Sequence, residues 1–392
     1  MSTYILILNC GSSSVKFSVM NPENGDEPFK GIAERLAGGN DGSITFKTEH
    51  GKREILIPAS HQAALEAIVS GLKEEGLFEQ IKAIGHRVVH GGEYFSQSVV
   101  IDEKVVEKIQ ECIALAPLHN PAHILGIKAA QSAFPHLKQV AVFDTAFHQQ
   151  IPEEAYLYPL PYHLYEQHKI RRYGFHGTSY RYIAGQLPNL LGQEKVKSIV
   201  CHLGNGGSIA ALDHDHSRDT TMGLTPLEGL VHGTRSGDID PALFQIIANQ
   251  TGKALSEIDA MLWKESGLLG LSSGLSNDCR VLEEAMQNGN TAATRAITVY
   301  AYRLAKHIAA QMVAIGGADC LVFTGGIGEN SPIIRGLTLE KLAFLGFTLD
   351  KALNDATFRG KQGAIHAAGS KPIWVIPTNE ELMIAKDTAA LS

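Results

Sequence analysis

Two stretches of the chain share one pattern of apolar and small polar positions. The first has an apolar run at 4–8, a turn of glycine and serine, and an alternating run at 15–20. The second repeats this order about half a chain later, with an apolar run at 196–203, a glycine-rich turn and a further run at 209–212. Apolar runs of this length bounded by turn residues predict strands. We therefore predict two hairpins of one design, and a duplication that gives two similar domains.

The rest of the chain alternates between helical and strand-like patterns, with a turn signal at Asn40-Asp41-Gly42. The expected helices cover 63–72, 103–115, 121–134, 242–250, 256–263, 278–286 and 292–315, with a last one after 379; the expected strands cover 81–85, 139–143, 320–324 and 373–376. Such alternation is typical of α/β domains with a mixed sheet. Residues 145–175 contain several prolines and lack periodicity, so we interpret them as the connection between domains.

We therefore expect a first domain at 1–148 and a second at 149–379, with the helix at about 380–392 packing back on the first. A chain of 392 residues is too long for one ordinary core, which agrees with two domains. A content of 44% hydrophobic and 19% charged residues is that of a globular protein. The net charge of -7 argues against nucleic acid as a partner.

The five cysteines are scattered and have no paired spacing, which fits reduced cytosolic thiols better than disulfides or a zinc site. No apolar run approaches the roughly 20 residues of a membrane span. We expect a cytoplasmic protein that binds neither membranes nor nucleic acid.

The turn of the first hairpin has the chemistry of an anion site. Gly11 lets a ligand approach the backbone, and the Ser12, Ser13 and Ser14 hydroxyls can donate to anionic oxygens. Lys16 adds a positive charge, and Asn9 offers an oxygen to a hydrated cation. The spacing is not that of a Walker loop. An ordinary serine-rich hairpin has the same composition, and this alternative stays open.

A second glycine-rich segment, 325–330, lies between a predicted strand and a helix that Ser331 and Pro332 should begin. Backbone N–H groups at such a position favour phosphate, although a tight turn without a ligand is the alternative. Asp278-Cys279-Arg280 lies at another helix start, where on its own it is best explained as a cap.

Four further side chains are candidates for catalysis. Arg87 and Arg235 lie in glycine-flanked segments, where a guanidinium can bind carboxylate or phosphoryl oxygens, although an ordinary ion pair explains either one alone. His176 is either a hydrogen-bond donor of the site or a histidine at a helix start. Asp144 follows a predicted strand, where open α/β sheets bind ligands and metals; a turn cap is the alternative.

The order of these segments resembles that of the acetate kinase family of short-chain carboxylate kinases, in the superfamily of acetate and sugar kinases, Hsp70 and actin. The matching segments are 9–16, 86–92, 116–120, 142–148, 172–178, 202–206, 234–238, 323–330 and 377–381. The resemblance extends from residue 3 nearly to the end of the chain.

The resemblance implies two duplicated ribonuclease-H-like domains of the actin-like ATPase type, with ATP in the cleft between them. It also implies Mg²⁺ on the phosphates, with Mn²⁺ able to take its place, and a homodimer. The implied reaction is reversible transfer of the γ-phosphoryl group of ATP to acetate, which gives acetyl phosphate and ADP. Nucleotide contacts are implied for Ser12, Lys16, His202, Leu203, Gly204, Asn205, Gly206, Asp278, Cys279, Arg280, Gly326, Ile327, Gly328, Glu329 and Asn330.

The family pattern also implies roles for the remaining candidates. Asn9 and Glu380 would hold the metal through its waters. Arg87 and Arg235 would bracket the acyl group and the moving phosphoryl group, His176 would donate to that group, and Asp144 would be the catalytic carboxylate. Because a carboxylate substrate is already ionised at neutral pH, it needs no general base. We therefore expect Asp144 to position magnesium and its waters rather than to remove a proton.

The apolar wall around the acyl group would consist of Val89, Leu118, Phe175 and Pro226, and the size of Val89 favours acetate. A propionate kinase of the same family is the nearest alternative. A non-catalytic ATP-binding module like actin or Hsp70 is an alternative of another class, and would have no use for the two arginines and His176. Two positions depart from the family pattern: Tyr180, where histidine is frequent, and His232, where methionine is common.

Overall fold

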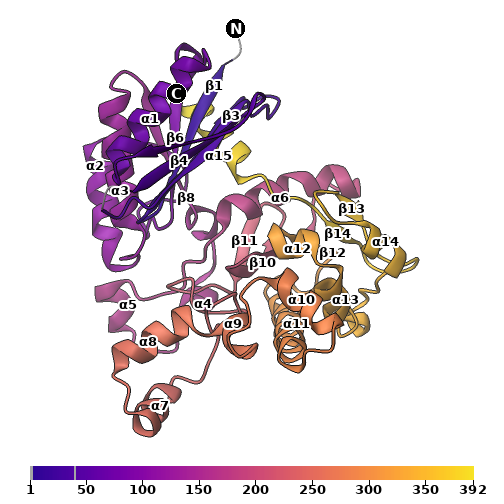
Figure 1. Cartoon of the computed structure of the whole chain (residues 1–392). Coiled ribbons are helices and arrows are strands. Elements are labelled where there is room, and N and C mark those ends of the chain that lie inside the picture. The colour runs from indigo at the N-terminus through magenta and orange to yellow at the C-terminus, as the bar shows by residue number, and fades with distance from the viewer. Residues whose placement is uncertain (1–2, 39–40) are drawn as a thin grey trace. The chain divides into compact units, whose positions relative to one another are not determined.

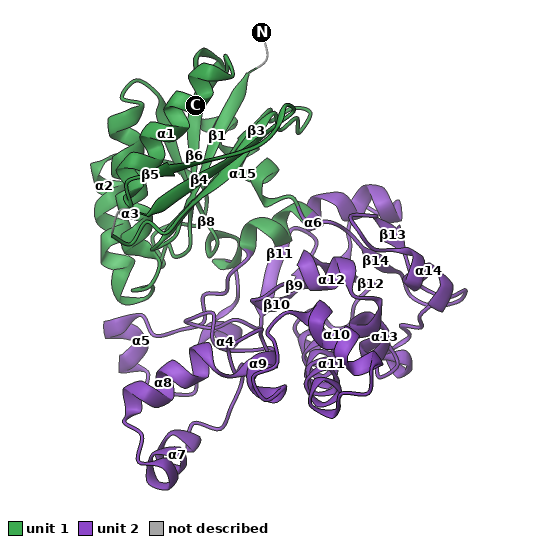
Figure 2. Cartoon of the chain, viewed as in Figure 1, with its two compact units in different colours: residues 1–149, 177–182, 379–392 green, residues 150–176, 183–378 purple. Residues whose placement is uncertain are grey.

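A computed structural model describes residues 3–38 and 41–392. The chain divides into two compact units (Figure 2), and each unit contains segments that are far apart in the sequence. The first unit consists of 1–149, 177–182 and 379–392, and the second of 150–176 and 183–378. The first unit thus includes the segment 177–182, and the expected domain boundaries at 1–148 and 149–379 stay a prediction. Within this unit the N–H of Gly177 donates to the carbonyl of Asp144 at 2.9 Å.

The described residues of the first unit form a mixed sheet of eight strands in the order β5-β4-β3-β2-β1-β6-β8-β7. The first five are an antiparallel meander, β6 and β8 run parallel to β1, and β7 pairs antiparallel with β8. Their bounds are β1 Tyr4–Cys10, β2 Ser14–Met20, β3 Phe29–Glu34, β4 Gly42–Thr48, β5 Gly51–Ile57, β6 Ile81–Val88, β7 Val99–Val100 and β8 Lys138–Phe143. Asn40, the first residue of the expected turn, lies outside the described part.

Helices cover both faces of this sheet, which explains why β1 is a continuous apolar run rather than an alternating one. Leu6 and Leu8 pack in a cluster with residues of α1 and α3, whereas Ile5 and Ile7 pack with Ile384 of α15. The last helix thus returns to the strands where the chain began (Figure 1). The helices are α1 His61–Glu74, η1 Phe78–Gln80, α2 Glu103–Glu111, η2 Cys112–Ala114, α3 Asn120–Ala133, η3 Ala146–His148 and α15 Glu380–Leu391.

The second unit repeats the central topology of the first. Its described strands have the order β11-β10-β9-β12-β14-β13; β9 pairs antiparallel with β10 and parallel with β12, as β1 does with β2 and β6. The bounds are β9 Lys197–Leu203, β10 Gly207–Asp213, β11 His216–Thr220, β12 Cys320–Thr324, β13 Gly363–Ala364 and β14 Ile373–Val375. The prediction of an α/β chain with two duplicated, mixed-sheet domains is confirmed.

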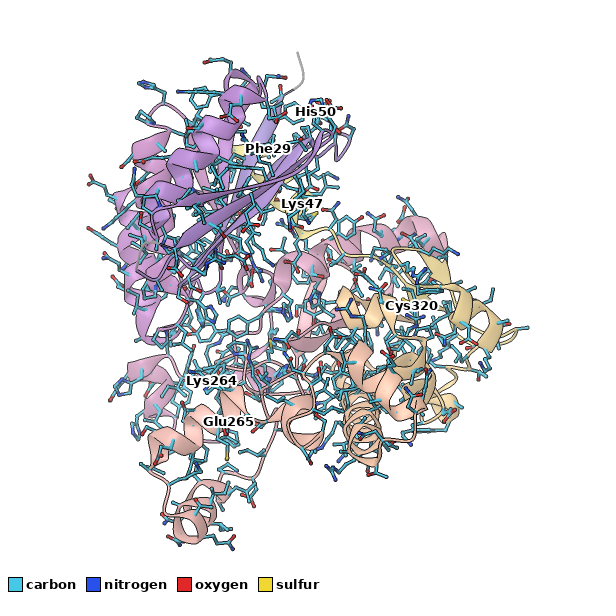
Figure 3. All side chains as sticks on the ribbon, viewed as in Figure 1. Phe29, Lys47, His50, Lys264, Glu265 and Cys320 are labelled. Carbon is cyan, nitrogen blue, oxygen red and sulfur yellow. The ribbon has the colours of Figure 1, made fainter. Side chains whose placement is uncertain are left out.

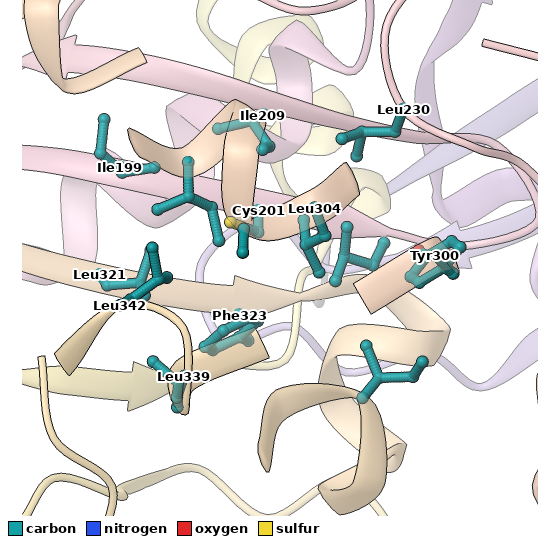
Figure 4. Close-up of a cluster of buried hydrophobic side chains, with 14 of the residues drawn as sticks. Ile199, Cys201, Ile209, Leu230, Tyr300, Leu304, Leu321, Phe323, Leu339 and Leu342 are labelled. Atoms are coloured by element: carbon teal, nitrogen blue, oxygen red, sulfur yellow. The ribbon is translucent and has the colours of Figure 1, made fainter. Parts of the chain in front are cut away.

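A long helix, α11 (Thr291–Gln311), packs in the main core of the second unit (Figure 4). Tyr300 and Leu304 on α11 belong to the same buried cluster as alternate residues of β9 and β12. The other helices are α4 Glu153–Tyr156, α5 His163–His168, α7 Leu243–Thr251, α8 Leu255–Lys264, α9 Gly267–Leu271, α10 Cys279–Gln287, η4 Met312–Ile315, α12 Gly325–Asn330, α13 Pro332–Leu339, η5 Ala343–Leu345 and α14 Lys351–Ala356. Helix α6 (Gly177–Leu191) is divided, with 177–182 in the first unit and 183–191 in the second.

One predicted turn is wrong: 325–330 is a short helix, α12, rather than an irregular loop. Gly325 (φ 76°) allows the abrupt change of direction after β12, and Ser331 then caps α13 by accepting from Ile334 N. Among the described helices, none has both the length and the apolar character needed to cross a lipid bilayer.

Candidate active site

Arg87 and Asp144 meet at the carboxyl edge of the first sheet. β6 and β8 are parallel neighbours in which Arg87 is opposite Val142, so the residue that follows β8 comes beside the arginine. Nε of Arg87 donates to Oδ1 of Asp144 at 2.9 Å, and Nη2 donates to Oδ2 at 2.8 Å. This is the bidentate geometry that fits a guanidinium to a carboxylate. The alternative of an ion pair is thus correct for Arg87, but its partner is another candidate residue.

Glu380 is the third member of this group, at the start of α15. Its Oε2 lies 3.9 Å from Nη1 of Arg87, so Arg87 lies between two carboxylates. The charge of Asp144 holds the pKa of Arg87 above its usual range, with a smaller contribution from Glu380. Burial raises the pKa of the Glu380 carboxyl, and the charge of Arg87 offsets part of that effect. Among the described residues no hydrogen bond reaches the Glu380 carboxylate, which leaves it able to bind a cation through water.

The first hairpin presents Asn9 and Lys16 side by side. They are opposite one another in the β1–β2 register, and the turn closes through a bond from Gly11 N to Ser14 O at 2.8 Å. Both line a cavity of about 470 Å³, and Glu381 and Lys47 (Figure 3) line it too. Ser12 is exposed in the turn and does not line this cavity. The sequence analysis did not single out Glu381, although it is adjacent to Glu380.

His176 lies at the amino end of α6 with a left-handed backbone (φ 59°), a conformation that costs energy for a residue with a Cβ atom. Its ring stacks on that of His202 with the centroids 4.2 Å apart. Nδ1 of His176 lies 2.9 Å from Oγ of Ser208, at the start of β10. Two groups of the second unit, the His202 ring and the Ser208 hydroxyl, thereby orient one imidazole. His176 lies at the start of a helix, as one of the two interpretations expected, and its role as a donor of the site stays a prediction.

Arg235 in the second unit differs from Arg87 in having no carboxylate partner among the described residues. Its Nη1 donates to the carbonyl of Pro226 at 3.1 Å, and its guanidinium lies over the Trp263 ring at 5.5 Å. A Cβ atom at Gly206 would come within 3.1 Å of Nη1, a tight contact, so the guanidinium lies close to the glycine turn. Burial lowers the pKa of Arg235. A partly desolvated cation without a counter-ion is suited to an anionic ligand.

A large cavity in the second unit has a volume of about 800 Å³. It is lined by Gly204, Asn205, Asn277, Asp278, Cys279, Arg280, Glu283, Gly326, Ile327, Asn330, Ser331, Phe358 and Arg359. Eight of the implied nucleotide contacts are in this set, from three separate segments. The volume is within the range of about 300–1,000 Å³ that is usual for small-molecule sites.

Five lining residues were missed by the sequence analysis: Asn277, Glu283, Ser331, Phe358 and Arg359. Asn277 and Ser331 are next to predicted residues, and Glu283 is one helical turn after Cys279, so spacing could have found these three. Phe358 and Arg359 follow α14 and have no local signal.

Some of the residues implied as nucleotide contacts do not line this cavity, and one of them, Glu329, binds backbone N–H groups instead. Oε1 of Glu329 accepts from Gly325 N at 2.8 Å and from Thr378 N at 3.1 Å. Gly328 is buried, while His202, Leu203 and Gly206 belong to the adjoining strand and turn. The cap interpretation of Asp278 is confirmed, because its side chain accepts from Arg280 N at 2.9 Å. Asp278 also forms a 2.6 Å ion pair with Arg280, which lowers the pKa of the Asp278 carboxyl.

The four residues of the implied acyl wall have different environments. In the first unit Val89 is half-buried and Leu118 is 64% exposed. In the second unit Phe175 is buried beside His176, and Pro226 is half-buried beside Arg235. Two residues depart from the family pattern, and both are fully buried. The ring of Tyr180 packs against that of His148. The Nδ1 atom of His232 accepts a hydrogen bond from Gly207 N at 3.0 Å. His232 therefore helps hold the glycine turn in place.

Buried histidines next to these residues make stability depend on pH. Burial lowers the pKa of His86, the neighbour of Arg87, to about 4, although a bond to Gln139 raises it in part. In the unfolded chain the pKa of a histidine is about 6.5. Between pH 6.5 and 4 His86 is therefore neutral in the folded protein and protonated in the unfolded chain, so unfolding takes up a proton. The His86 contribution is present above pH 6.5 and is lost as the pH falls towards 4, at about 1.4 kcal/mol per pH unit.

We expect His86→Gln to make the fall of the unfolding free energy between pH 6.5 and 4.5 less steep, as measured by urea denaturation. The matched control is His50→Gln, at the exposed β4–β5 turn (Figure 3), where the side chain of His50 is 74% exposed. An equal slope in wild type and His86→Gln would contradict this prediction.

The fold and the site together define an α/β protein of the duplicated actin-like ATPase class, with a glycine-lined cavity in its second unit. The family model of the acetokinase family matches residues 4–386. An acetate kinase from Dichelobacter nodosus is 64% identical over 390 residues, which cover 99% of this chain and 98% of that protein.

Two solved structures are also similar. A propionate kinase from Francisella tularensis subsp. tularensis has a TM-score of 0.94 and 48% identity, with all of both chains covered. An acetate kinase from Porphyromonas gingivalis has a TM-score of 0.94 and 43% identity over 99% of each chain. The chain belongs to the acetokinase family, and the predicted resemblance is confirmed.

Proposed function

We propose that this chain is an acetate kinase that reversibly transfers the γ-phosphoryl group of ATP to acetate, giving acetyl phosphate and ADP. The observation that supports this most directly is Arg235, a partly desolvated cation that lies close to Gly206, next to a cavity lined by Gly204 and Asn205. Family membership over nearly the whole chain supports the same reaction.

Transfer of a phosphoryl group requires alignment and neutralisation of charge on three oxygens. In our proposal Arg235 and Arg87 bind the acyl carboxylate and the moving phosphoryl group, and His176 donates to that group from a ring held by His202 and Ser208. Acetate arrives as a carboxylate and attacks without losing a proton. The meeting of residues from both units over one terminal phosphate stays a prediction.

The oxygen donors of the first unit suit Mg²⁺. The described residues include no group of three or more His, Cys, Asp or Glu that could enclose a metal. Mg²⁺ generally keeps several waters and uses one or two carboxylates together with substrate phosphates, so such an enclosure is not required. Asn9 and Glu380, whose carboxylate accepts no hydrogen bond from the residues that the structure describes, would hold it through water. When bound, Mg²⁺ or Mn²⁺ supplies charge neutralisation on the phosphates.

The deciding experiment is to incubate the protein with ATP, Mg²⁺ and acetate and to trap acyl phosphate with hydroxylamine. We expect a hydroxamate together with stoichiometric ADP. ADP formation without acyl phosphate, or ATP binding without turnover, would instead indicate the ATP-binding module. The cytoplasmic location and the homodimer also stay predictions; the five cysteines, all free and buried, are consistent with a reducing compartment.

Asp144 should position Mg²⁺ and its waters rather than act as a base, since both its carboxylate oxygens already accept from Arg87. We expect Asp144→Asn to lose activity at low Mg²⁺ and to regain much of it at high Mg²⁺, in titrations run beside wild type. Loss of one limb of the pH–rate profile with an unchanged Mg²⁺ dependence would show instead that Asp144 transfers a proton.

Val89 should limit the size of the acyl group. One methylene in an apolar pocket changes discrimination by about 1–3 kcal/mol, so propionate is expected as a poorer substrate rather than an excluded one. We expect Val89→Ala to narrow the acetate-to-propionate ratio of kcat/KM. Val100→Ala on the edge strand β7, where the valine is 40% exposed, is the control and should leave the ratio unchanged. An unchanged ratio in Val89→Ala would contradict this role.

A further inference from the structure

The loop that carries Pro226 and Arg235 is long and irregular. It runs from the end of β11 at Thr220 to the start of α7 at Leu243, and no helix or strand occurs within it. Loops of this length without secondary structure are uncommon in compact domains and are generally functional. Because a misplacement of about 1 Å at a reacting group can cost about 100-fold in rate, such a loop must be held by other contacts.

The first part of this loop is held by Arg172. Nη1 of Arg172 donates to the carbonyls of Thr220 at 2.9 Å, Thr221 at 3.2 Å and Met222 at 3.2 Å. Nη2 donates to Oε1 of Glu228 at 2.6 Å. One guanidinium therefore ties the beginning of the loop to a side chain six residues further on. Arg172 belongs to one of the family-like segments, but neither the resemblance nor the proposed function gives it a role.

Tyr158 completes this arrangement from the segment before α5. Its hydroxyl donates to Oε2 of Glu228 and accepts from Leu224 N at 2.8 Å. Both carboxylate oxygens of Glu228 are thus engaged, one by each partner. Gly223 is required here, because a Cβ atom would come within 1.6 Å of Oε2 of Glu228 and 2.1 Å of the Tyr158 hydroxyl.

The later part of the loop is anchored separately, by Asp238. Its Oδ1 accepts from Gly229 N at 2.7 Å, and its own N–H donates to Gly229 O at 3.0 Å. Residue 226 therefore lies in a stretch with one anchor on each side. The carbonyl of Pro226 in that stretch accepts from Nη1 of Arg235. A displacement of this stretch would move the acceptor that orients the guanidinium.

We propose that Tyr158, Arg172 and Glu228 form a clamp that positions Pro226 and, through its carbonyl, the guanidinium of Arg235. They are positioning residues, since their contacts are with the loop rather than with a ligand. The consequence for catalysis rests on the proposed function, whereas the consequence for the placement of Arg235 does not.

The clamp is tested with Tyr158→Phe, which deletes one hydroxyl and keeps the ring. We expect kcat/KM for acetate to fall about 10- to 100-fold while KM for ATP stays within about twofold, because most of the lining of the large cavity lies outside the loop. The matched control is Tyr162→Phe, a tyrosine of the same segment that is 52% exposed and should be neutral. A parallel rise in both KM values, or no change, would overturn the proposal.

A double-mutant cycle shows whether the clamp acts through Arg235. On an Arg235→Lys background, adding Tyr158→Phe should lower the remaining activity by less than about threefold, because the geometry it maintains is already lost. If the double variant loses activity by the product of the two single-variant factors, Tyr158 does not act through Arg235. Should Tyr158→Phe unfold, as judged by its melting temperature, Glu228→Gln takes its place in the same cycle.

A spectroscopic readout separates the clamp from the proposed reaction. The chain has two tryptophans, and Trp263 lies under the guanidinium of Arg235. With Trp374→Phe as the background, Tyr158→Phe should change Trp263 emission and Tyr162→Phe should not. If wild type makes no acyl phosphate but the emission changes, the proposed function fails and the clamp stands. If acyl phosphate forms and the emission does not change, the clamp fails.

Discussion

Arg87→Gln is expected to lower kcat/KM for acetate by at least about 1,000-fold and also to destabilise the protein. Removing a charged donor to a phosphoryl group in flight costs about this much in related reactions. Here the loss would also leave the Asp144 carboxylate, 4% exposed, without its bidentate partner and close to Glu380. Breaking a buried pair by removing one member typically costs about 3–5 kcal/mol. Steady-state rates and urea denaturation at pH 7.5 measure the two effects.

A second substitution tests the cause of the instability. Arg87→Gln combined with Asp144→Asn should recover much of the stability, because the unpaired charge is gone, while activity stays low. The surface control is Arg53→Gln, which breaks an ion pair with Glu74 in which both side chains are about half exposed, and it should change little. Full stability in Arg87→Gln would show that the Asp144 carboxylate does not depend on its ion pair.

Arg235→Gln is expected to lower kcat by about 1,000-fold with little or no loss of stability. The contrast with Arg87 follows from their partners, since Arg235 has one hydrogen bond, to a backbone carbonyl, and no ion pair among the described residues. Replacing a partly desolvated cation by a neutral amide relieves a desolvation cost and leaves no carboxylate unpaired. The melting temperature should therefore stay at or above that of wild type.

The control for this second substitution is Arg303→Gln, an exposed arginine of the same unit that donates to the carbonyl of Asp238 at 3.4 Å. It should retain wild-type kinetics. Retained activity in Arg235→Gln would remove the main support for the proposed function. A loss of stability as large as in Arg87→Gln would mean that Arg235 has a structural partner.

Local sequence predicted elements wherever the relevant interactions lie close together in the chain. The sequence predicted the two hairpins, the long helix α11 and the capping of α13 by Ser331. Periodicity, turn glycines and caps involve residues only a few positions apart, so they can be recognised in the sequence. The short helix α12 was missed because its glycines give no periodic signal. The first unit also includes 177–182, where Gly177 N donates to the carbonyl of Asp144, 33 positions earlier in the chain.

The sequence by itself determined the fold class and the duplication, because these depend on apolar periodicity and on glycine turns that form locally. Its resemblance to the family implied eight of the residues that line the large cavity. Tertiary structure alone decided which charges are paired: Arg87 with Asp144, and Arg235 with no carboxylate of the described part of the chain. It alone brought Phe358 and Arg359 to the cavity and Tyr158 and Arg172 to Glu228. The reason is physical, since ion pairing and desolvation depend on distances between side chains that chain folding brings together.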